Sequence, residues 1–257
     1  MPFLHLDERL CDNHDPVHAF NTVALRRLRR SWDRRARVWD HHGAPALQPV
    51  IEAVLGACNV QPGNHVVDLG CGTGQLSIPL ARSGARVTAV DISEAMVDGL
   101  SKKAALDGLD NIVGVVSPVQ AVDLAPGSVD LIVSNYALHH LRHRDKQALV
   151  SAAMRWLRPG GRLVIGDMML GLGVSARDRA IIGSKLARLA RKGPGGWWRI
   201  IKNVGRYTLR LREHPATMER WRRYLEDAGF SAVTVTPIVA EAAIVAGSKP
   251  DPVRGPA

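Results

Sequence analysis

The 257-residue chain lacks the features that mark membrane-spanning and secreted proteins. It contains no run of about 18 uncharged apolar residues, the length that a membrane-spanning helix needs. Residues 1–8 have neither a basic start nor an apolar stretch, so they do not resemble a secretory signal peptide. The three cysteines, Cys11, Cys58 and Cys71, are odd in number and have no spacing typical of disulfides or metal sites. These absences predict a cytoplasmic protein whose thiols stay reduced.

Two catalytic signatures are also absent. The chain contains no G-x-S-x-G motif, which would carry the nucleophile of a hydrolase. Its ten histidines show no grouping with the spacing of metal ligands, so we expect no bound metal. Apolar residues make up 46% of the chain, which suffices for the core of one large α/β domain with additions.

Positive charge is present in excess and is unevenly placed. The net charge of +10 conceals +6 in residues 26–37 and +11 in residues 175–224, so the rest of the chain carries −7. Both basic segments have apolar residues at three- and four-residue steps, which predicts amphipathic helices. The sequence therefore predicts an acidic core with two basic helical additions.

The most informative part of the chain is a glycine-rich stretch, residues 66–77, with the sequence VVDLGCGTGQLS. An apolar run leads into Gly70, Gly72 and Gly74 and a helical pattern follows, which predicts a strand, a tight turn and the start of a helix. Glycines tolerate positive φ and let a ligand lie against bare backbone, while the amides at the helix N-terminus face the turn. The spacing differs from the G-x-G-x-x-G of dinucleotide sites, and Asp68 would repel a pyrophosphate but suits a ligand with positive charge.

Residues 68–74, DLGCGTG, resemble the first motif of the class I S-adenosylmethionine (SAM) methyltransferases, and the resemblance covers about residues 47–248. It implies an α/β fold with a Rossmann-like, doubly wound, seven-stranded sheet whose last strand is antiparallel. It also implies SAM as cofactor, with S-adenosylhomocysteine as product, and a methionine end held by Asp68 and the three glycines. The alternative is a glycine-rich turn between strand and helix that binds no ligand.

A second acidic residue ends the next apolar run. Residues 86–91 predict a buried parallel strand, and Asp91 lies 21 residues beyond Gly70, close to the spacing at which βαβ folds place a ribose-binding carboxylate. In the family that this chain resembles, this acid binds the ribose hydroxyls, and the next residue, here Ile92, packs on the adenine. Alternatively, Asp91 caps the helix that starts near Ser93.

After a third predicted strand, residues 111–116, the chain departs from the family pattern. Relatives usually have an acidic residue there that meets the adenine amino group, but this chain has Pro118. The backbone amide of Val119 still suits adenine, and Gln120 or Ser117 can replace the missing acceptor.

The fourth predicted strand, residues 129–134, runs into SNYALHHL, which resembles the fourth motif of small-molecule methyltransferases. In open α/β sheets ligands bind beyond the carboxyl ends of the strands, so this segment is expected to face the transferred methyl group. It lacks both prolines of the Asn-Pro-Pro-Tyr motif of enzymes that methylate nucleic acid bases. We expect Ser134 to contact SAM and Asn135 and Tyr136 to contact the acceptor.

His139 and His140, in the same segment, are candidate catalytic bases because an imidazole titrates near neutral pH. A base is needed only if the acceptor must lose a proton, as a phenol does. The alternative is that either histidine bonds the backbone and holds the loop.

Residues 17–40 predict a helix that carries Trp32 and Trp39 on its apolar face. These two rings are expected either to pack on the core or to help cover the acceptor pocket. The helix would thus form one part of a cap over the core.

Residues 175–212 predict two basic amphipathic helices that form the second part of this cap, and Trp197 and Trp198 there are expected to contact the acceptor. The basic side chains of this cap have three interpretations. They form a solvated face, line a pocket for an anionic or phenolic acceptor, or bind RNA or an anionic lipid surface.

The chain is therefore expected to have five parts. They are an arm and capping helix (residues 1–44), a SAM-binding core (45–170), the basic cap (171–214), a helix and strands that complete the core (215–248) and a disordered tail (249–257). Within the core, residues 157–162 predict a turn and residues 163–167 a fifth strand.

These patterns predict a SAM-dependent methyltransferase acting on a small organic acceptor of natural-product, phenolic or quinone-like type, mainly by holding the reactants in line. Two alternatives stay open: an RNA methyltransferase that uses the basic cap, and a SAM-binding protein that transfers no methyl group. Peripheral contact with a membrane is compatible with the basic cap.

Overall fold

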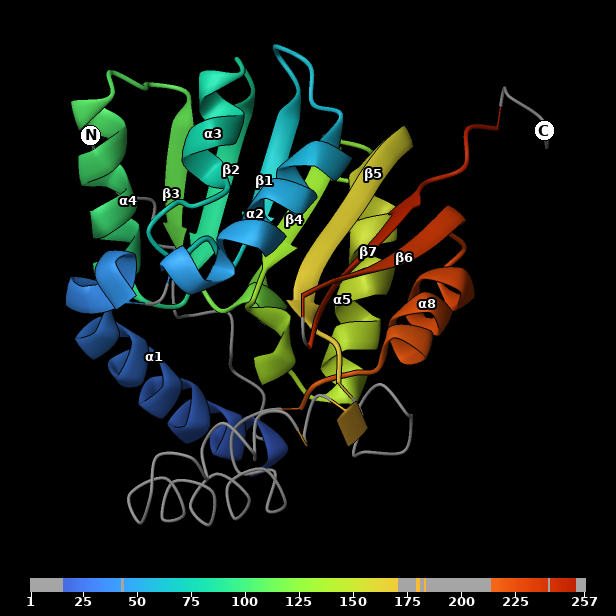
Figure 1. The fold of residues 1–257 in the computed structure, drawn as a ribbon, viewed down its shortest axis with the longest axis horizontal. Helices are drawn as coiled ribbons and strands as arrows, with labels where there is room; N and C mark the ends of the chain where they lie inside the picture. Colours follow the sequence, from blue (N-terminus) through green and yellow to red (C-terminus); the bar gives the residue numbers. More distant parts are fainter. Residues whose placement is uncertain are drawn as a thin grey trace.

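The computed structural model describes residues 16–42, 44–170, 179, 180, 183, 214–239 and 241–252 (Figure 1). Within these residues one seven-stranded sheet has the order β3-β2-β1-β4-β5-β7-β6. Its strands are β1 (His65–Leu69), β2 (Arg86–Asp91), β3 (Ile112–Val116), β4 (Val129–Asn135), β5 (Leu157–Met168), β6 (Ser231–Val239) and β7 (Ala242–Ser248). The helices include α1 (Pro16–His42), α2 (Ala44–Cys58), α3 (Ser77–Arg82), α4 (Glu94–Leu106), α5 (His143–Trp156) and α8 (Met218–Asp227), with short 3-10 turns η2 (Val119–Ala121) and η3 (Leu138–His140).

The strand directions agree with the predicted fold class. Strands β1 to β5 pair in parallel, and β7 runs antiparallel to both β5 and β6. In β4, the side chains of Leu131, Ile132 and Val133 are at most 2% exposed, as expected of a parallel strand that is covered on both faces. The doubly wound sheet with an antiparallel last strand is confirmed.

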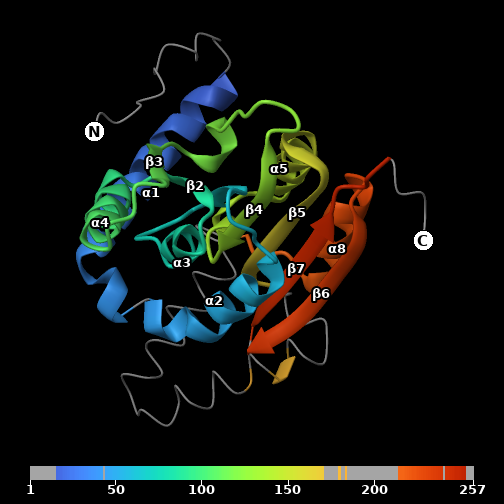
Figure 2. The ribbon, with the colours of Figure 1, turned by 90° about the horizontal axis from the view of Figure 1, so that it is seen from above.

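Helices cover both faces of this sheet. Figure 2 shows α2 and α3 on the side opposite α5. Val54 of α2 and Leu80 of α3 belong to one apolar core, whereas Trp156 of α5 and Trp221 of α8 belong to the other. Both faces of the sheet are therefore covered, and a binding site is expected at the carboxyl ends of its strands.

Helix α1 runs below the carboxyl ends of the strands (Figure 1), in agreement with the capping helix predicted for residues 17–40. It is joined to the start of α4 by an ion pair of 2.8 Å between Arg29 Nη2 and Glu94 Oε2. Beside this pair, the hydroxyl of Ser93 donates a hydrogen bond of 2.6 Å to Asp33 Oδ1. These contacts place one face of α1 over the edge of the sheet.

The turn predicted for residues 157–162 is wrong as a boundary, because β5 already begins at Leu157. Leu157 pairs with Val129, and Arg162 pairs with Leu131 two residues further along β4. The extra residues bulge out of the ladder around Gly160, whose φ of 75° is left-handed. A proline-glycine pair thus interrupts the strand without ending it.

The predicted tail also begins differently from expectation. The backbone of Lys249 exchanges hydrogen bonds with Gly160 and Gly161, at 3.0 and 2.8 Å. Its ammonium donates a bond of 2.7 Å to the carbonyl of Leu157. Lys249 therefore extends the contact between β7 and β5, and residues 253–257 lie outside the described part.

Most of the predicted basic cap, residues 171–214, also lies outside the described part of the chain. None of the described helices is long and apolar enough to cross a membrane. Among the described residues no cluster of three or more histidine, cysteine, aspartate or glutamate side chains suits a metal ion. Of the cysteines, Cys58 and Cys71 are buried and free, and Cys11 is not described.

Candidate functional site

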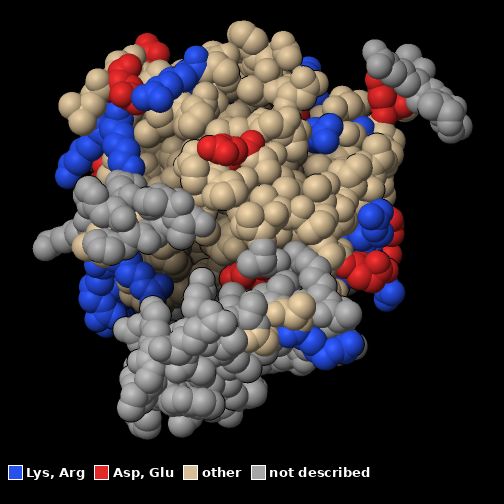
Figure 3. All heavy atoms as spheres, in the orientation of Figure 1, with Lys and Arg blue, Asp and Glu red and all other residues tan. Residues whose placement is uncertain are grey.

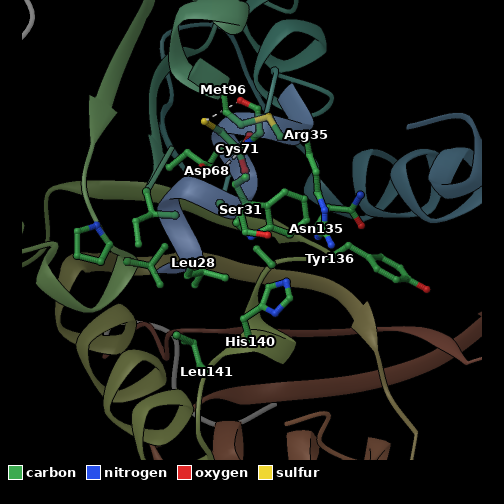
Figure 4. A pocket seen from close by; sticks show the side chains of 18 of the residues that line it. Leu28, Ser31, Arg35, Asp68, Cys71, Met96, Asn135, Tyr136, His140 and Leu141 are labelled. Carbon is green, nitrogen blue, oxygen red and sulfur yellow. Dashed lines mark hydrogen bonds between the residues drawn. The ribbon is translucent and has the colours of Figure 1, made fainter. Parts of the chain in front are cut away.

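A pocket with a volume of about 420 Å³ opens between α1 and the carboxyl ends of β1, β2 and β4. Figure 4 shows Asp68 and Cys71 on one side of it and His140 and Leu141 across from them. The predicted site residues in its lining are Asp68, Gly70, Gly72, Asp91, Ile92, Val119, Asn135, Tyr136 and His140. Segments from Leu25 of α1 to His214 before α8 therefore meet in one cavity, which lies at the carboxyl ends of the parallel strands.

Asp68, near the end of β1, is the most buried acid in this lining, with 1% of its surface exposed. Ser77 at the start of α3 donates a hydrogen bond of 2.6 Å to its Oδ2 atom. Its Oδ1 atom is buried and has no hydrogen-bond partner within the described residues. Burial, with a smaller contribution from the charge of Asp91, raises the pKa of this carboxyl to about 7. A cationic group placed at Oδ1 would satisfy the oxygen and restore its negative charge.

The three glycines of the turn all have positive φ but serve different purposes. A side chain on Gly70 would collide with Ala137, since a Cβ atom would lie 2.2 Å from that of Ala137. A Cβ on Gly74 would lie 2.3 Å from Leu100 Cδ1, and Gly74 is not part of the pocket lining. Gly72 faces the pocket. Gly70 and Gly72 therefore line the pocket, whereas Gly74 lies in the contact between the turn and α4.

Asp91, at the end of β2, accepts a backbone hydrogen bond on each of its carboxylate oxygens. The amide of Gly72 donates to Oδ2 at 3.0 Å, and the amide of Ser93 donates to Oδ1 at 2.8 Å. The N-cap of α4 is Ser93, whose hydroxyl accepts from the amide of Met96, so the alternative in which Asp91 caps this helix is wrong. Each oxygen of Asp91 keeps a second lone pair for a ligand hydroxyl, although burial raises the pKa of the carboxyl.

The segment after β3 lines the far end of the pocket with Pro118, Val119 and Gln120. The hydroxyl of Ser117 donates a hydrogen bond of 3.1 Å to the carbonyl of Pro118, and Ser117 is not in the lining. Of the two replacements considered for the missing acid, the structure therefore places Gln120 at the pocket and Ser117 behind it.

On the other side of the turn, Asn135 and Tyr136 reach the pocket from the end of β4. Tyr136 has a left-handed φ of 51°, and its amide donates to the carbonyl of Gly166 at 2.8 Å. Ser134, one residue earlier, is 1% exposed and donates its hydroxyl to the carbonyl of Leu69 at 2.7 Å. Ser134 is outside the lining and joins β4 to β1, so its position does not support the predicted contact with SAM.

The two candidate bases occupy different environments. His140 lines the pocket, and its ring lies edge to face against Trp32 of α1, with 5.6 Å between the centroids. His139 is 7% exposed and lies behind it, outside the lining, with Nδ1 2.7 Å from Asp167 Oδ1. Their rings are 4.1 Å apart. Of the two candidate bases, His140 therefore faces the pocket, and His139 lies behind it against Asp167.

Sequence reasoning missed three residues of this site. Asp167, the last residue but one of β5, bonds His139, and an acid near the carboxyl end of a strand is the pattern that could have drawn attention to it. Arg35 of α1 lines the pocket between two tryptophan positions of the same helical face. Lys146 of α5 is fully buried and donates to the carbonyls of Leu141 and His214, which both line the pocket.

The structure describes only two of the four tryptophans that were predicted to lie in the cap. Trp32 and Trp39 both line the pocket, with 5.3 Å between their ring centroids. Trp197 and Trp198 lie outside the described residues, so their predicted contact with the acceptor stays a prediction.

A family described as "Methyltransferase domain" matches residues 66–161 of this chain. A ubiquinone biosynthesis O-methyltransferase of Xanthomonas oryzae pv. oryzae (strain PXO99A) is 35% identical over 199 residues, which cover 74% of this chain and 75% of that protein. The protein of the same name from Xanthomonas euvesicatoria pv. vesicatoria (strain 85-10) is 33% identical, with 80% of each chain covered.

Solved structures share the fold. Magnesium protoporphyrin IX methyltransferase from Synechocystis PCC 6803, solved with bound S-adenosylhomocysteine, aligns with a TM-score of 0.61 at 22% identity. This alignment covers 89% of the present chain and 98% of the other. A putative SAM-dependent methyltransferase from Methanococcus maripaludis aligns with a TM-score of 0.57 at 24% identity, covering 87% and 94% of the two chains.

Proposed function

This chain belongs to the class I SAM-dependent methyltransferases, and we propose that it transfers the methyl group of SAM to a hydroxyl oxygen of a small phenolic or quinone-like acceptor. One observation carries the proposal. A single pocket joins two acids that suit SAM, Asp68 and Asp91, to a polar and aromatic wall that includes Tyr136 and His140. The names of the curated relatives support a quinone-like acceptor and give no support to RNA as substrate.

The residues on the acidic side fit SAM. The unpartnered Oδ1 of Asp68 suits the ammonium group of its methionine part, and the carboxylate of Asp91 suits both ribose hydroxyls. Ile92 and Val119 line the same pocket, which supports the proposal that the side chain of Ile92 and the amide of Val119 contact the adenine. Gly72 leaves room for the ligand against bare backbone.

The sulfonium of bound SAM supplies a methyl group that is already activated for displacement. The chain therefore contributes mainly alignment, because a correctly oriented pair of reactants reacts as if one were present at very high concentration. Asn135, at the end of β4, and Tyr136, in the loop that follows, line the pocket and position the acceptor.

A phenolic acceptor must also lose a proton. His140 is the imidazole of the pocket lining, so a ring nitrogen of His140 is the proposed acceptor of the hydroxyl proton. His139, bonded to Asp167, supports the ring of His140 from behind. Arg142, which immediately precedes α5 and lines the pocket, favours a phenolate or another anionic group on the acceptor.

Calorimetric titration with SAM tests the cofactor half of the proposal. Replacing Asp91 by alanine removes charge-assisted hydrogen bonds that are worth roughly 1.5–3 kcal/mol each, so SAM should bind on the order of ten to a hundred times more weakly. Asp123→Ala, at an exposed acid outside the lining, is the matched control. Undetectable binding to the native protein, or equal affinities for native and Asp91→Ala protein, would refute the SAM site.

The acceptor half is tested with a panel of catechols, phenols and hydroquinones incubated with protein and SAM. We expect stoichiometric release of S-adenosylhomocysteine and a product heavier by one methylene unit. Tight SAM binding without either product across the panel would favour a protein that binds SAM and transfers no methyl group.

A further inference from the structure

The indole of Trp39 has a donor that no described residue satisfies. Trp39 lies near the end of α1 and lines the pocket, and its Nε1 atom is buried without a hydrogen-bond partner among the described residues. This nitrogen lies above the turn, only 3.7 Å from the point at which Gly72 would carry a Cβ atom. Because an indole N–H can only donate, it calls for an acceptor atom on a ligand that rests against the turn.

Arg35 adds positive charge at the same place on α1. It precedes Trp39 by one helical turn, so the two side chains share a face of the helix. Its guanidinium carbon lies 5.0 Å from the ring centroid of Trp32, and that ring lies edge to face with Trp39. Arg35 is exposed and belongs to the pocket lining, and Figure 4 shows it reaching from α1 into the pocket.

The opposite wall carries the opposite charge. Asp68 sits at the end of β1 with Oδ1 unpartnered, and Asp91 sits beside it at the end of β2. A ligand between the two walls therefore meets carboxylates from the sheet and a cation with an N–H donor from α1. This arrangement suits a zwitterion whose ammonium faces the sheet and whose carboxylate faces α1.

We propose that Trp39 and Arg35 bind the α-carboxylate of the methionine part of SAM, while Asp68 binds its α-ammonium. The inference rests on the proposed function, since it concerns the same cofactor. The carboxylate is the one anionic group of SAM, so it is the group that a donor and a cation together select. Helix α1 then forms one wall of the cofactor site, and the positive charge of Arg35 on this helix binds an anionic group inside the pocket.

The test compares two ligands that differ in this one group. SAM and decarboxylated SAM both keep the sulfonium, the ammonium, the ribose and the adenine. Calorimetric titration of each ligand into native protein, Trp39→Phe and Arg35→Met gives the affinities. Arg34→Met is the matched control, because Arg34 is an exposed arginine of the same helix that is not part of the pocket lining. Circular dichroism melting curves establish that each variant is folded.

We expect Trp39→Phe and Arg35→Met to weaken SAM by about tenfold each and to leave decarboxylated SAM unchanged. Native protein should bind decarboxylated SAM at least tenfold more weakly than SAM, and Arg34→Met should keep that preference. Equal losses for both ligands in Trp39→Phe would overturn the proposal, because the indole would then contact a shared group such as the ribose. If native protein binds neither ligand, the proposed function itself fails, which is a different result.

Discussion

The buried ammonium of Lys146 donates a hydrogen bond of 2.7 Å to the backbone carbonyl of His214. The same ammonium donates to the carbonyl of Leu141, and the amide of His214 donates to the carbonyl of His139 at 2.6 Å. Lys146 of α5 thus joins the loop that carries His139 and His140 to His214, in the segment before α8. Because Leu141 and His214 line the pocket, this fastening shapes its wall.

Lys146 should make stability depend on pH in the alkaline range. Burial lowers its pKa from 10.5 to about 8, so between these values the unfolded chain binds more protons than the native protein. Stability from this group must therefore rise with pH across that window. We expect the unfolding free energy of native protein, relative to Lys146→Met, to increase from pH 8 to pH 10 in urea titrations. The exposed Lys102→Met should give no such slope, and a flat difference for Lys146→Met would contradict the prediction.

Asp68 should make SAM binding depend on pH near neutrality. Its carboxyl has a pKa of about 7 in the protein without ligand, so below this pH it is protonated and attracts the ammonium of SAM less strongly. The affinity should then fall by up to about tenfold per pH unit on the acid side, which corresponds to the free energy of one pKa unit. Titrations between pH 5.5 and pH 8, spanning the pKa of about 7, measure this slope, which Asp68→Asn should reduce. An equally steep profile in Asp68→Asn would assign the effect to another group, with Asp91 the first to examine.

Gln120 should replace the acid that relatives use to bind adenine. It lines the pocket beside Pro118, whereas the hydroxyl of Ser117 is bonded to the backbone. Loss of one hydrogen bond nets roughly 0.5–1.5 kcal/mol, so Gln120→Ala should weaken SAM by about two- to tenfold. Ser117→Ala is the control and should change the affinity little. The opposite ranking of these two variants would show that the backbone around Pro118 moves when SAM binds.

His140 should affect turnover rather than cofactor binding. With a phenolic acceptor, His140→Gln should lower kcat by roughly 10²- to 10⁴-fold, the usual contribution of a positioned base, and leave the affinity for SAM unchanged. The acid limb of the pH–rate profile should disappear with the imidazole.

Asp167→Asn tests the supporting role of His139 in the same assay. Because Asp167 bonds His139 behind the pocket, we expect a smaller loss of kcat and a shift of the pH–rate profile without its disappearance. A full rate with His140→Gln, together with a large loss in His139→Gln, would exchange the two roles.

Much of the fold could be predicted because its signals are local. Apolar runs that end in Asp68 and Asp91 mark two parallel strands, and the glycines between them mark the turn. The ends of these strands meet at one edge of the sheet whatever the details, so the SAM side of the pocket followed from the pattern. The turn predicted at residues 157–162 was wrong because pairing with β4 and with Lys249 keeps that segment in the ladder.

Which of two neighbouring residues lines the pocket depends on the direction of each side chain, and neighbouring side chains point in different directions. His139 and His140 are adjacent in a 3-10 turn, where successive side chains point to different sides, so spacing alone cannot rank them. Ser134 and Asn135 likewise alternate across β4, and one is buried in a bond to Leu69 while the other reaches the pocket. Gly74 looks like its two companions in sequence, but its missing side chain makes room for Leu100.

By itself, then, the sequence determined the sheet, the glycine turn and the two acids that suit SAM, because these rest on short-range patterns of apolar residues, glycines and strand ends. Only the tertiary structure brought Trp39 close to Gly72 and Arg35 into the pocket lining, bonded Lys146 to the carbonyl of His214 and separated the two histidines. Those relations join residues that are tens of positions apart, or neighbours that face opposite sides. They are decided by how α1 lies across the carboxyl ends of the strands and how α5 packs on one face of the sheet, which no local pattern encodes.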